Sequence, residues 1–162
     1  MDKDKTSECF NVLNLSDPEN CPYYMISRVT LSVTSVLKKE FNDADIEGVK
    51  PAYIGVLMSL WEEDGLKVVE LAHKVRLEPS SMTGLIDRME RDNLLYRASD
   101  LDDRRIHRIF LTDHARDIKK PVLDVLNKTF SGLFDGINEK EFIQTMAFLK
   151  KILANSEDRR KE

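Results

Sequence analysis

The sequence contains only two cysteines among its 162 residues, Cys9 and Cys21, and it has no long run of apolar residues. Two cysteines are too few for the disulfide framework of a small secreted domain. No stretch approaches the roughly eighteen consecutive apolar residues of a membrane-spanning helix. The first eight residues are rich in Asp and Lys and lack the apolar segment of a signal peptide. These absences predict a cytoplasmic protein with reduced thiols and no membrane partner.

The sequence also lacks the patterns on which enzymatic chemistry depends. Its three histidines, His73, His107 and His114, have no metal-ligand spacing with one another or with the cysteines. It contains no glycine-rich phosphate loop and no nucleophile elbow. We therefore expect no enzymatic activity, no metal site and no bound cofactor.

The sequence has only five prolines and six glycines, which argues against a disordered or all-β chain. Its apolar and charged contents, 41% and 33%, are those of a soluble protein with a packed core. The net charge of −4 is weak evidence against a nucleic-acid partner, but the charge is unevenly distributed. Residues 67–108 carry nine basic and eight acidic side chains, so this segment is slightly positive and the rest of the chain is negative.

Helical periodicity of apolar residues is present at both ends of the chain. Residues 22–41 predict one long helix, and Pro51 suits the first turn of the next. Thr112 and Asp113 predict the start of a later helix with a kink at Pro121.

The last helix is predicted to begin at a capping box formed by Asn138 and Glu141. The outer helices are too long and too apolar to act only as supports for the middle of the chain, so we expect them to meet a partner chain. The predicted regions are a leader (1–21), dimerisation helices (22–48 and 113–155), a DNA-binding domain (49–112) and a charged tail (156–162).

The middle of the chain predicts a helix-turn-helix. Apolar residues at i, i+3, i+4 and i+7 occur from Val68 to Val75 and again from Met82 to Met89, with a break at residues 77–79. The second of these helices has a polar opposite face, and in a helix-turn-helix it enters the major groove. The polar residues suited to bases or phosphates are Ser80, Ser81, Thr83, Arg88 and Arg91. The alternative interpretation is an ordinary amphipathic helix with a solvated face.

A β-hairpin with a charged tip is predicted directly after the helix-turn-helix, which is the position of a wing. Strand character occurs in residues 94–97 and 106–111. Arg104 and Arg105 lie at the tip with Asp103, and an arginine on a narrow hairpin suits the negative potential of the minor groove. The alternative interpretation is a solvated charged turn.

At these motifs the sequence resembles the MarR family of winged helix-turn-helix regulators. Residues 80–94 are similar to that family's recognition helix and its exit, and residues 100–105 match its wing motif Asp-x-x-Asp-Arg-Arg. Leu111-Thr112 matches its Leu-Thr helix start. Asn93 replaces a glycine of the family pattern, and we expect it to adopt the left-handed conformation that asparagine tolerates.

The resemblance implies a mainly α fold in which a winged helix-turn-helix lies between dimerisation helices. It implies a repressor that binds double-stranded DNA as a homodimer on a pseudo-palindromic operator. It further implies that Arg105 enters the minor groove, that Asp103 orients it, and that Arg104 contacts the DNA backbone. The alternative is a winged-helix module that binds protein and not DNA.

The resemblance also implies a small aromatic or amphipathic effector. The candidate lining residues are Tyr23, Tyr24, Arg28, Trp61 and His114, for which core packing of the aromatics is the alternative. A second alternative is peroxide or thiol sensing of the OhrR type through Cys21, because a cysteine at a helix N-terminus can react as its thiolate.

Overall fold

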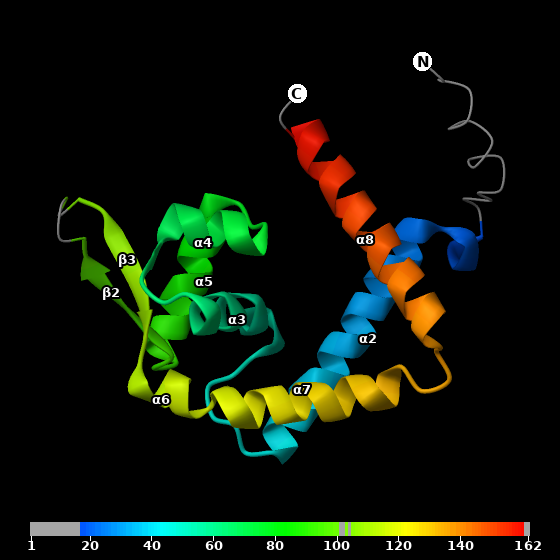
Figure 1. Ribbon diagram of the computed structural model, residues 1–162, viewed down its shortest axis with the longest axis horizontal. Helices are drawn as coiled ribbons and strands as arrows, with labels where there is room; N and C mark the ends of the chain where they lie inside the picture. The colour runs from blue at the N-terminus through cyan, green and yellow to red at the C-terminus, as the bar shows by residue number, and fades with distance from the viewer. Residues whose placement is uncertain (1–16, 101–102, 104, 161–162) are drawn as a thin grey trace. The chain divides into compact units, whose positions relative to one another are not determined.

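The computed structural model describes residues 17–100, 103 and 105–160, and it contains two compact units (Figure 1). The first unit extends to Leu126 and the second begins at Asn127. The structure is mainly helical and contains one small antiparallel sheet, which confirms the predicted mainly α, winged helix-turn-helix class. The elements in chain order are η1 (Pro18–Asn20), α2 (Pro22–Asp43), η2 (Pro51–Tyr53), α3 (Ile54–Glu62), β1 (Leu66–Lys67), α4 (Val68–Val75), α5 (Pro79–Arg91), β2 (Leu95–Ser99), β3 (His107–Leu111), α6 (Asp113–Asp117), α7 (Lys119–Leu133) and α8 (Glu139–Arg160).

Helix α2 confirms the long helix predicted near the N-terminus. Pro22 occupies its first turn, where the missing N–H has no helical partner to lose. Leu37 and Phe41 near its C-terminal end are buried, whereas the apolar side chains of its first turns are exposed. Only the C-terminal end of this helix therefore belongs to the core of the first unit.

The helix-turn-helix consists of α4 and α5, as the repeated apolar spacing predicts. Pro79 starts α5, and the side chains of Met82, Ile86 and Met89 are completely buried on one face. Leu71 of α4 is buried to the same degree. This packing fixes the direction in which the opposite face of α5 points.

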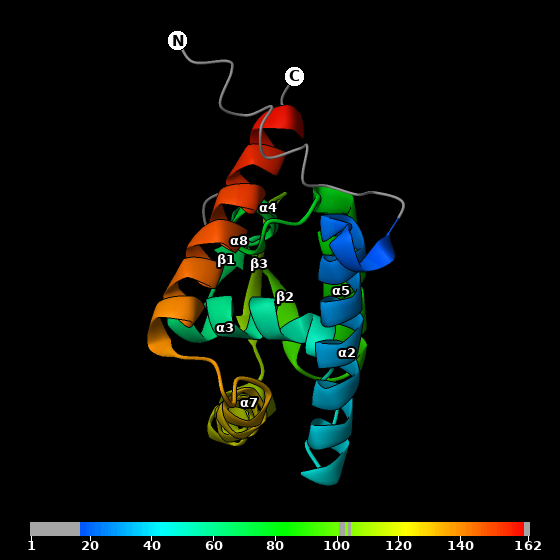
Figure 2. The same ribbon diagram turned by 90° about the vertical axis from the view of Figure 1, so that its right-hand side faces the viewer.

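The wing belongs to a three-stranded antiparallel sheet in the order β1-β3-β2, which can be followed in Figure 2. Strands β2 and β3 confirm the predicted hairpin, with Leu95 opposite Leu111. Strand β1 was not predicted, because two residues are too few to display an alternating pattern. Asn93 has a φ of 56°, which confirms the left-handed conformation expected where the chain leaves α5.

The prediction of one helix kinked at Pro121 is wrong, because two helices, α6 and α7, meet at Ile118. Pro121 has no N–H to donate to the carbonyl of Asp117, so helical bonding is interrupted one turn before the proline. The predicted cap at the start is confirmed, since the Thr112 hydroxyl accepts a hydrogen bond from the Ala115 N–H at 3.1 Å.

The second unit joins the end of α7 to α8. Phe134 stacks on Phe130 at 5.6 Å and meets Phe142 edge-on at 5.4 Å between ring centroids. The capping box is confirmed: the N–H of Asn138 donates to the Glu141 carboxylate at 2.9 Å, and the N–H of Glu141 donates to the Asn138 side chain at 3.0 Å. Helix α8 continues to Arg160, so it includes most of the segment interpreted as a charged tail.

In the part of the chain that the structure describes, no helix is long and apolar enough to cross a membrane.

Candidate nucleic-acid interface

Helix α5 presents a row of polar side chains on the face opposite its buried one. The exposed members are Ser80, Ser81, Thr83, Arg88 and Arg91. The hydroxyl of Thr83 donates to the carbonyl of Pro79 at 3.0 Å, which leaves its oxygen available as an acceptor. The Arg91 Nε donates to the carbonyl of Asp87 at 3.3 Å, which turns its guanidinium back along the helix. The face therefore offers short hydroxyls near its start and cationic side chains further along.

The C-terminal end of α5 is held by a cluster of three side chains. The Asp92 carboxylate accepts hydrogen bonds from Lys50 Nζ at 2.5 Å and from the Tyr53 hydroxyl at 2.6 Å. Lys50 first, and then Tyr53, lowers the pKa of Asp92 below its usual value. Asp92 in turn raises the pKa of Lys50, whereas burial is the main reason that the pKa of Tyr53 is raised. About forty positions separate these residues from Asp92, so no local pattern reveals the cluster.

Arg97 of β2 connects the wing to α5. Its guanidinium bonds to Asp87 at 2.6 Å and also to the carboxylate of Glu90, and its backbone N–H donates to Glu90 at 3.1 Å. One guanidinium thereby pairs with two carboxylates of the candidate recognition helix and reduces their combined charge from −2 to −1. Sequence analysis missed this role, although the three residues lie within ten positions of one another.

A buried carboxylate organises the base of the wing. Only 6% of the surface of Asp100 is exposed, and it accepts a hydrogen bond from Arg108 Nε at 2.5 Å and from the Asp103 N–H at 3.3 Å. Arg108 also donates to the carbonyl of Gly65 at 2.8 Å, which ties the hairpin to the turn before β1. Burial is tolerable for Asp100 because the charge is paired and hydrogen-bonded.

At the tip, the structure brings Asp103 and Arg105 together. The Arg105 side chain is 95% exposed, and its Nε lies 3.9 Å from the Asp103 carboxylate. The same carboxylate accepts the Arg105 N–H at 3.0 Å. Arg104, the other predicted wing contact, lies outside the described residues. The roles of these residues on DNA remain predictions.

The five candidate effector residues do not gather in one place. The Trp61 Nε1 donates to the carbonyl of Ala115 at 2.9 Å, where α3 meets α6, the helix that carries the half-buried His114. Tyr23, 82% exposed, lies on the first turns of α2, as do the exposed Tyr24 and Arg28. None of the five lines either of the two cavities described next.

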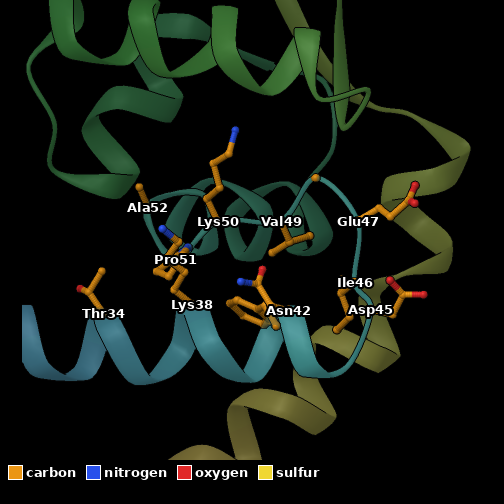
Figure 3. A pocket seen from close by; sticks show the side chains of 12 residues that line it. Thr34, Lys38, Asn42, Asp45, Ile46, Glu47, Val49, Lys50, Pro51 and Ala52 are labelled. Atoms are coloured by element: carbon orange, nitrogen blue, oxygen red, sulfur yellow. The ribbon is translucent and has the colours of Figure 1, made fainter.

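Two cavities of about 580 Å³ each occur in the first unit. One lies between the C-terminal half of α2 and residues 45–52 (Figure 3). The other lies beside β1 and α4, where Val69, His73 and Arg108 contribute to its walls. Sequence analysis anticipated neither cavity.

Cys21 is half-buried at the N-cap of α2, and its side chain makes no capping hydrogen bond. Cys9 lies outside the described residues, so the redox interpretation remains a prediction. Among residues 17–100, 103 and 105–160, no three His, Cys, Asp or Glu side chains gather closely enough to hold a metal ion.

Comparison with known proteins gives consistent matches. The family model for the MarR family matches residues 51–107. The chain is 30% identical over 143 residues to the HTH-type transcriptional repressor MdtR of Bacillus subtilis, covering 85% of this chain and 92% of that protein. The repressor CouR of Rhodococcus jostii, solved on a 23-mer DNA duplex, has a TM-score of 0.72 at 20% identity, covering 83% and 93% of the two chains. BpsR of Bordetella bronchiseptica, whose DNA binding is regulated by 6-hydroxynicotinic acid, has a TM-score of 0.71 at 19% identity, covering 82% and 92%.

Proposed function

The chain belongs to the MarR family of transcriptional regulators, which are not enzymes, and from this premise we propose that it is a repressor that binds its operator as a homodimer. The repressor role is supported by MdtR and by CouR, which carry that role in their own names. We place DNA binding in residues 49–112 and dimerisation in residues 22–48 and 113–155.

The observation that carries this proposal is the combination of the α5 face with the wing tip. Five exposed polar side chains lie on one face of a helix whose other face is anchored in the core. Arg105 extends from the hairpin that follows, with 95% of its side chain exposed. A recognition helix and an arginine-bearing wing match the major and minor grooves of one DNA segment.

In this proposal the side chains have separate tasks. Ser80, Ser81, Thr83 and Arg88 face the bases or backbone of the major groove, and Arg91 reaches phosphates. Arg105 enters the minor groove with Asp103 restricting its conformations, and Arg104 contacts the backbone.

Exposed apolar residues support the proposed homodimer. The first turns of α2 carry Tyr23, Met25 and Val29 on the surface, and α8 exposes Ile143 and Phe148. Exposed apolar side chains gathered on a helix are typical of a face that a partner covers. Because a two-fold dimer presents two recognition helices, its operator is expected to be pseudo-palindromic.

The test is binding of the purified protein to its own promoter region, titrated with salt and with unlabelled competitor DNA. Phosphate contacts release counterions, so the affinity should fall steeply with salt and resist the competitor. Arg88→Ala and Arg105→Ala should each weaken binding by about tenfold or more. Lys39→Ala, which removes an exposed cation of α2, is the matched control and should change little.

Binding that ignores DNA sequence and survives Arg105→Ala would contradict the proposal. That result would favour the alternative of a winged-helix module that docks on protein.

We further propose that a small aromatic or amphipathic effector modulates DNA binding. The regulation of BpsR by 6-hydroxynicotinic acid supports this part of the proposal.

A further inference from the structure

Three helices, α2, α4 and α5, end in the same type of turn, each with a non-glycine residue in the left-handed conformation. These residues are Asp45, Arg76 and Asn93, with φ values of 53°, 58° and 56°. Glycine is usual at this position, because a side chain there brings its Cβ atom close to a carbonyl oxygen. Asparagine and aspartate tolerate the conformation, since their short polar side chains bond locally. Arg76 is therefore the exceptional residue of the three.

The conformation of Arg76 is fixed by the backbone bonds that end α4. Its N–H donates to the carbonyl of His73 at 3.2 Å, and the N–H of Leu77 donates to the carbonyl of Ala72 at 2.9 Å. This pair of bonds is a Schellman motif, which places the residue at this position in the left-handed region. Glycine would form the same turn at a lower conformational cost. The turn itself therefore does not explain why the residue is an arginine.

Arg76 lies where a helix-turn-helix approaches the DNA backbone. Only residues 77 and 78 separate it from Pro79, the first residue of α5. In a helix-turn-helix the first residues of the second helix contact base edges, while the first helix crosses the DNA backbone. The exposed Arg76 ends the first helix and closely precedes the second. Its guanidinium group suits a phosphate, to which it can donate two parallel hydrogen bonds.

We propose that Arg76 binds a phosphate of the DNA backbone beside the recognition helix, and that this contact explains an arginine in an unfavourable backbone conformation. The inference rests on the proposed function, because it needs DNA binding through α4 and α5. A phosphate contact positions a protein on the duplex and does not read the bases. Arg76 should therefore contribute equally to the affinity for the operator and for DNA of unrelated sequence.

The first experiment measures the affinity of the full-length protein for promoter DNA and for an unrelated duplex at several salt concentrations. Arg76→Gly should raise both dissociation constants by a similar factor, about tenfold. The slope of log affinity against log salt concentration should become shallower by about two for the promoter, because each protomer of the dimer loses one phosphate contact. Arg76→Lys keeps the charge and should retain most of the affinity. Lys39→Ala, which removes an exposed cation from α2, is the matched control and should leave the slope unchanged.

The second experiment measures thermal denaturation of the same variants without DNA. Arg76→Gly should raise the melting temperature by roughly 2–4 °C, because glycine adopts the left-handed conformation without strain. A variant that is more stable and yet binds DNA more weakly cannot owe its weaker binding to partial unfolding.

The outcomes that contradict this inference differ from those that contradict the proposed function. Unchanged DNA affinity and salt slope in Arg76→Gly would overturn the phosphate contact. A lower melting temperature of Arg76→Gly would overturn the argument from backbone conformation, because the side chain would then stabilise the fold. Failure of the wild-type protein to bind DNA would instead contradict the proposed function.

Discussion

At the scale of single residues, Asp92 is a carboxylate whose acid titration should change the stability of the protein. Its pKa is lowered from the usual 3.8, mainly by Lys50, so its stabilising contribution is complete above that pH and is lost as the pH falls through the lower folded value. Asp92→Asn should therefore reduce the free energy of unfolding by about 1 kcal/mol at pH 7, because it removes the charge that pairs with the exposed, screened Lys50 and leaves Tyr53 a weaker, neutral acceptor. The difference from the wild type should shrink below about pH 4.

Urea denaturation from pH 7 to pH 3 measures this difference. Asp43→Asn is the control, because Asp43 is an exposed carboxylate that lies 4.0 Å from Lys39. A deficit of Asp92→Asn that stays constant across this pH range would show that its charge is not the cause.

Arg97 is the second residue with a specific expectation. Arg97→Met leaves Asp87 and Glu90 uncompensated on α5, where they repel phosphates, so the DNA dissociation constant should rise by about tenfold or more. Arg97→Lys keeps the charge but loses the two-pronged geometry, so its affinity should be intermediate. Fluorescence anisotropy with labelled promoter DNA at two salt concentrations tests this ranking. Lys120→Met, which breaks a pair within α7, serves as the comparison, and equal affinities for all variants would refute the role.

At the scale of elements, the sequence predicted a helix or a cap correctly where the residues that form it lie close together in the chain. The amphipathic helices α4 and α5 and the capping box of α8 follow from residues within a few positions of one another, and the sequence predicted them correctly. Strand β1 exists only because it pairs with β3 some forty positions later, so its own two residues carry no signal. The polar face of α5 follows from the spacing of neighbouring residues, and the sequence therefore indicated it. The Lys50–Tyr53–Asp92 cluster and the cavity beside α2 depend on contacts that no local pattern reveals, and the sequence did not predict them.

Thr112 is a single side chain that connects the start of α6 to the residue that follows α5. Its oxygen caps α6 by accepting the Ala115 N–H, and its hydroxyl donates to the carbonyl of Asn93 at 2.8 Å. Thr112→Ala should lower the free energy of unfolding by about 1–2 kcal/mol, because it loses both bonds. Thr112→Ser keeps both and should lose much less. Thermal denaturation compares the two variants, and equal melting temperatures would contradict the capping role.

At the scale of the whole molecule, the exposed apolar side chains of α2 and α8 make the oligomeric state the property to test. If α2 and α8 form the proposed dimer interface, a charge there must be buried without a partner, which is costly. Val29→Glu and Ile143→Glu should each convert the dimer into a monomer in sedimentation equilibrium. Val69→Glu introduces the same charge at an apolar position of α4 that is at least as exposed, and it should leave the dimer intact.

The DNA measurement follows from the same variants. A monomer contacts only one half-site of the operator. In the dimer, binding of one recognition helix holds the second at a high effective concentration near the other half-site. Because the monomer lacks this linkage, its operator affinity should fall by roughly a hundredfold or more. Val69→Glu is a control for assembly only, because α4 belongs to the proposed DNA-binding domain, where an added carboxylate repels phosphates. If Val29→Glu and Ile143→Glu stay dimeric and bind DNA like the wild type, the exposed faces of α2 and α8 are not the dimer interface, and the half-site spacing must be set by another surface.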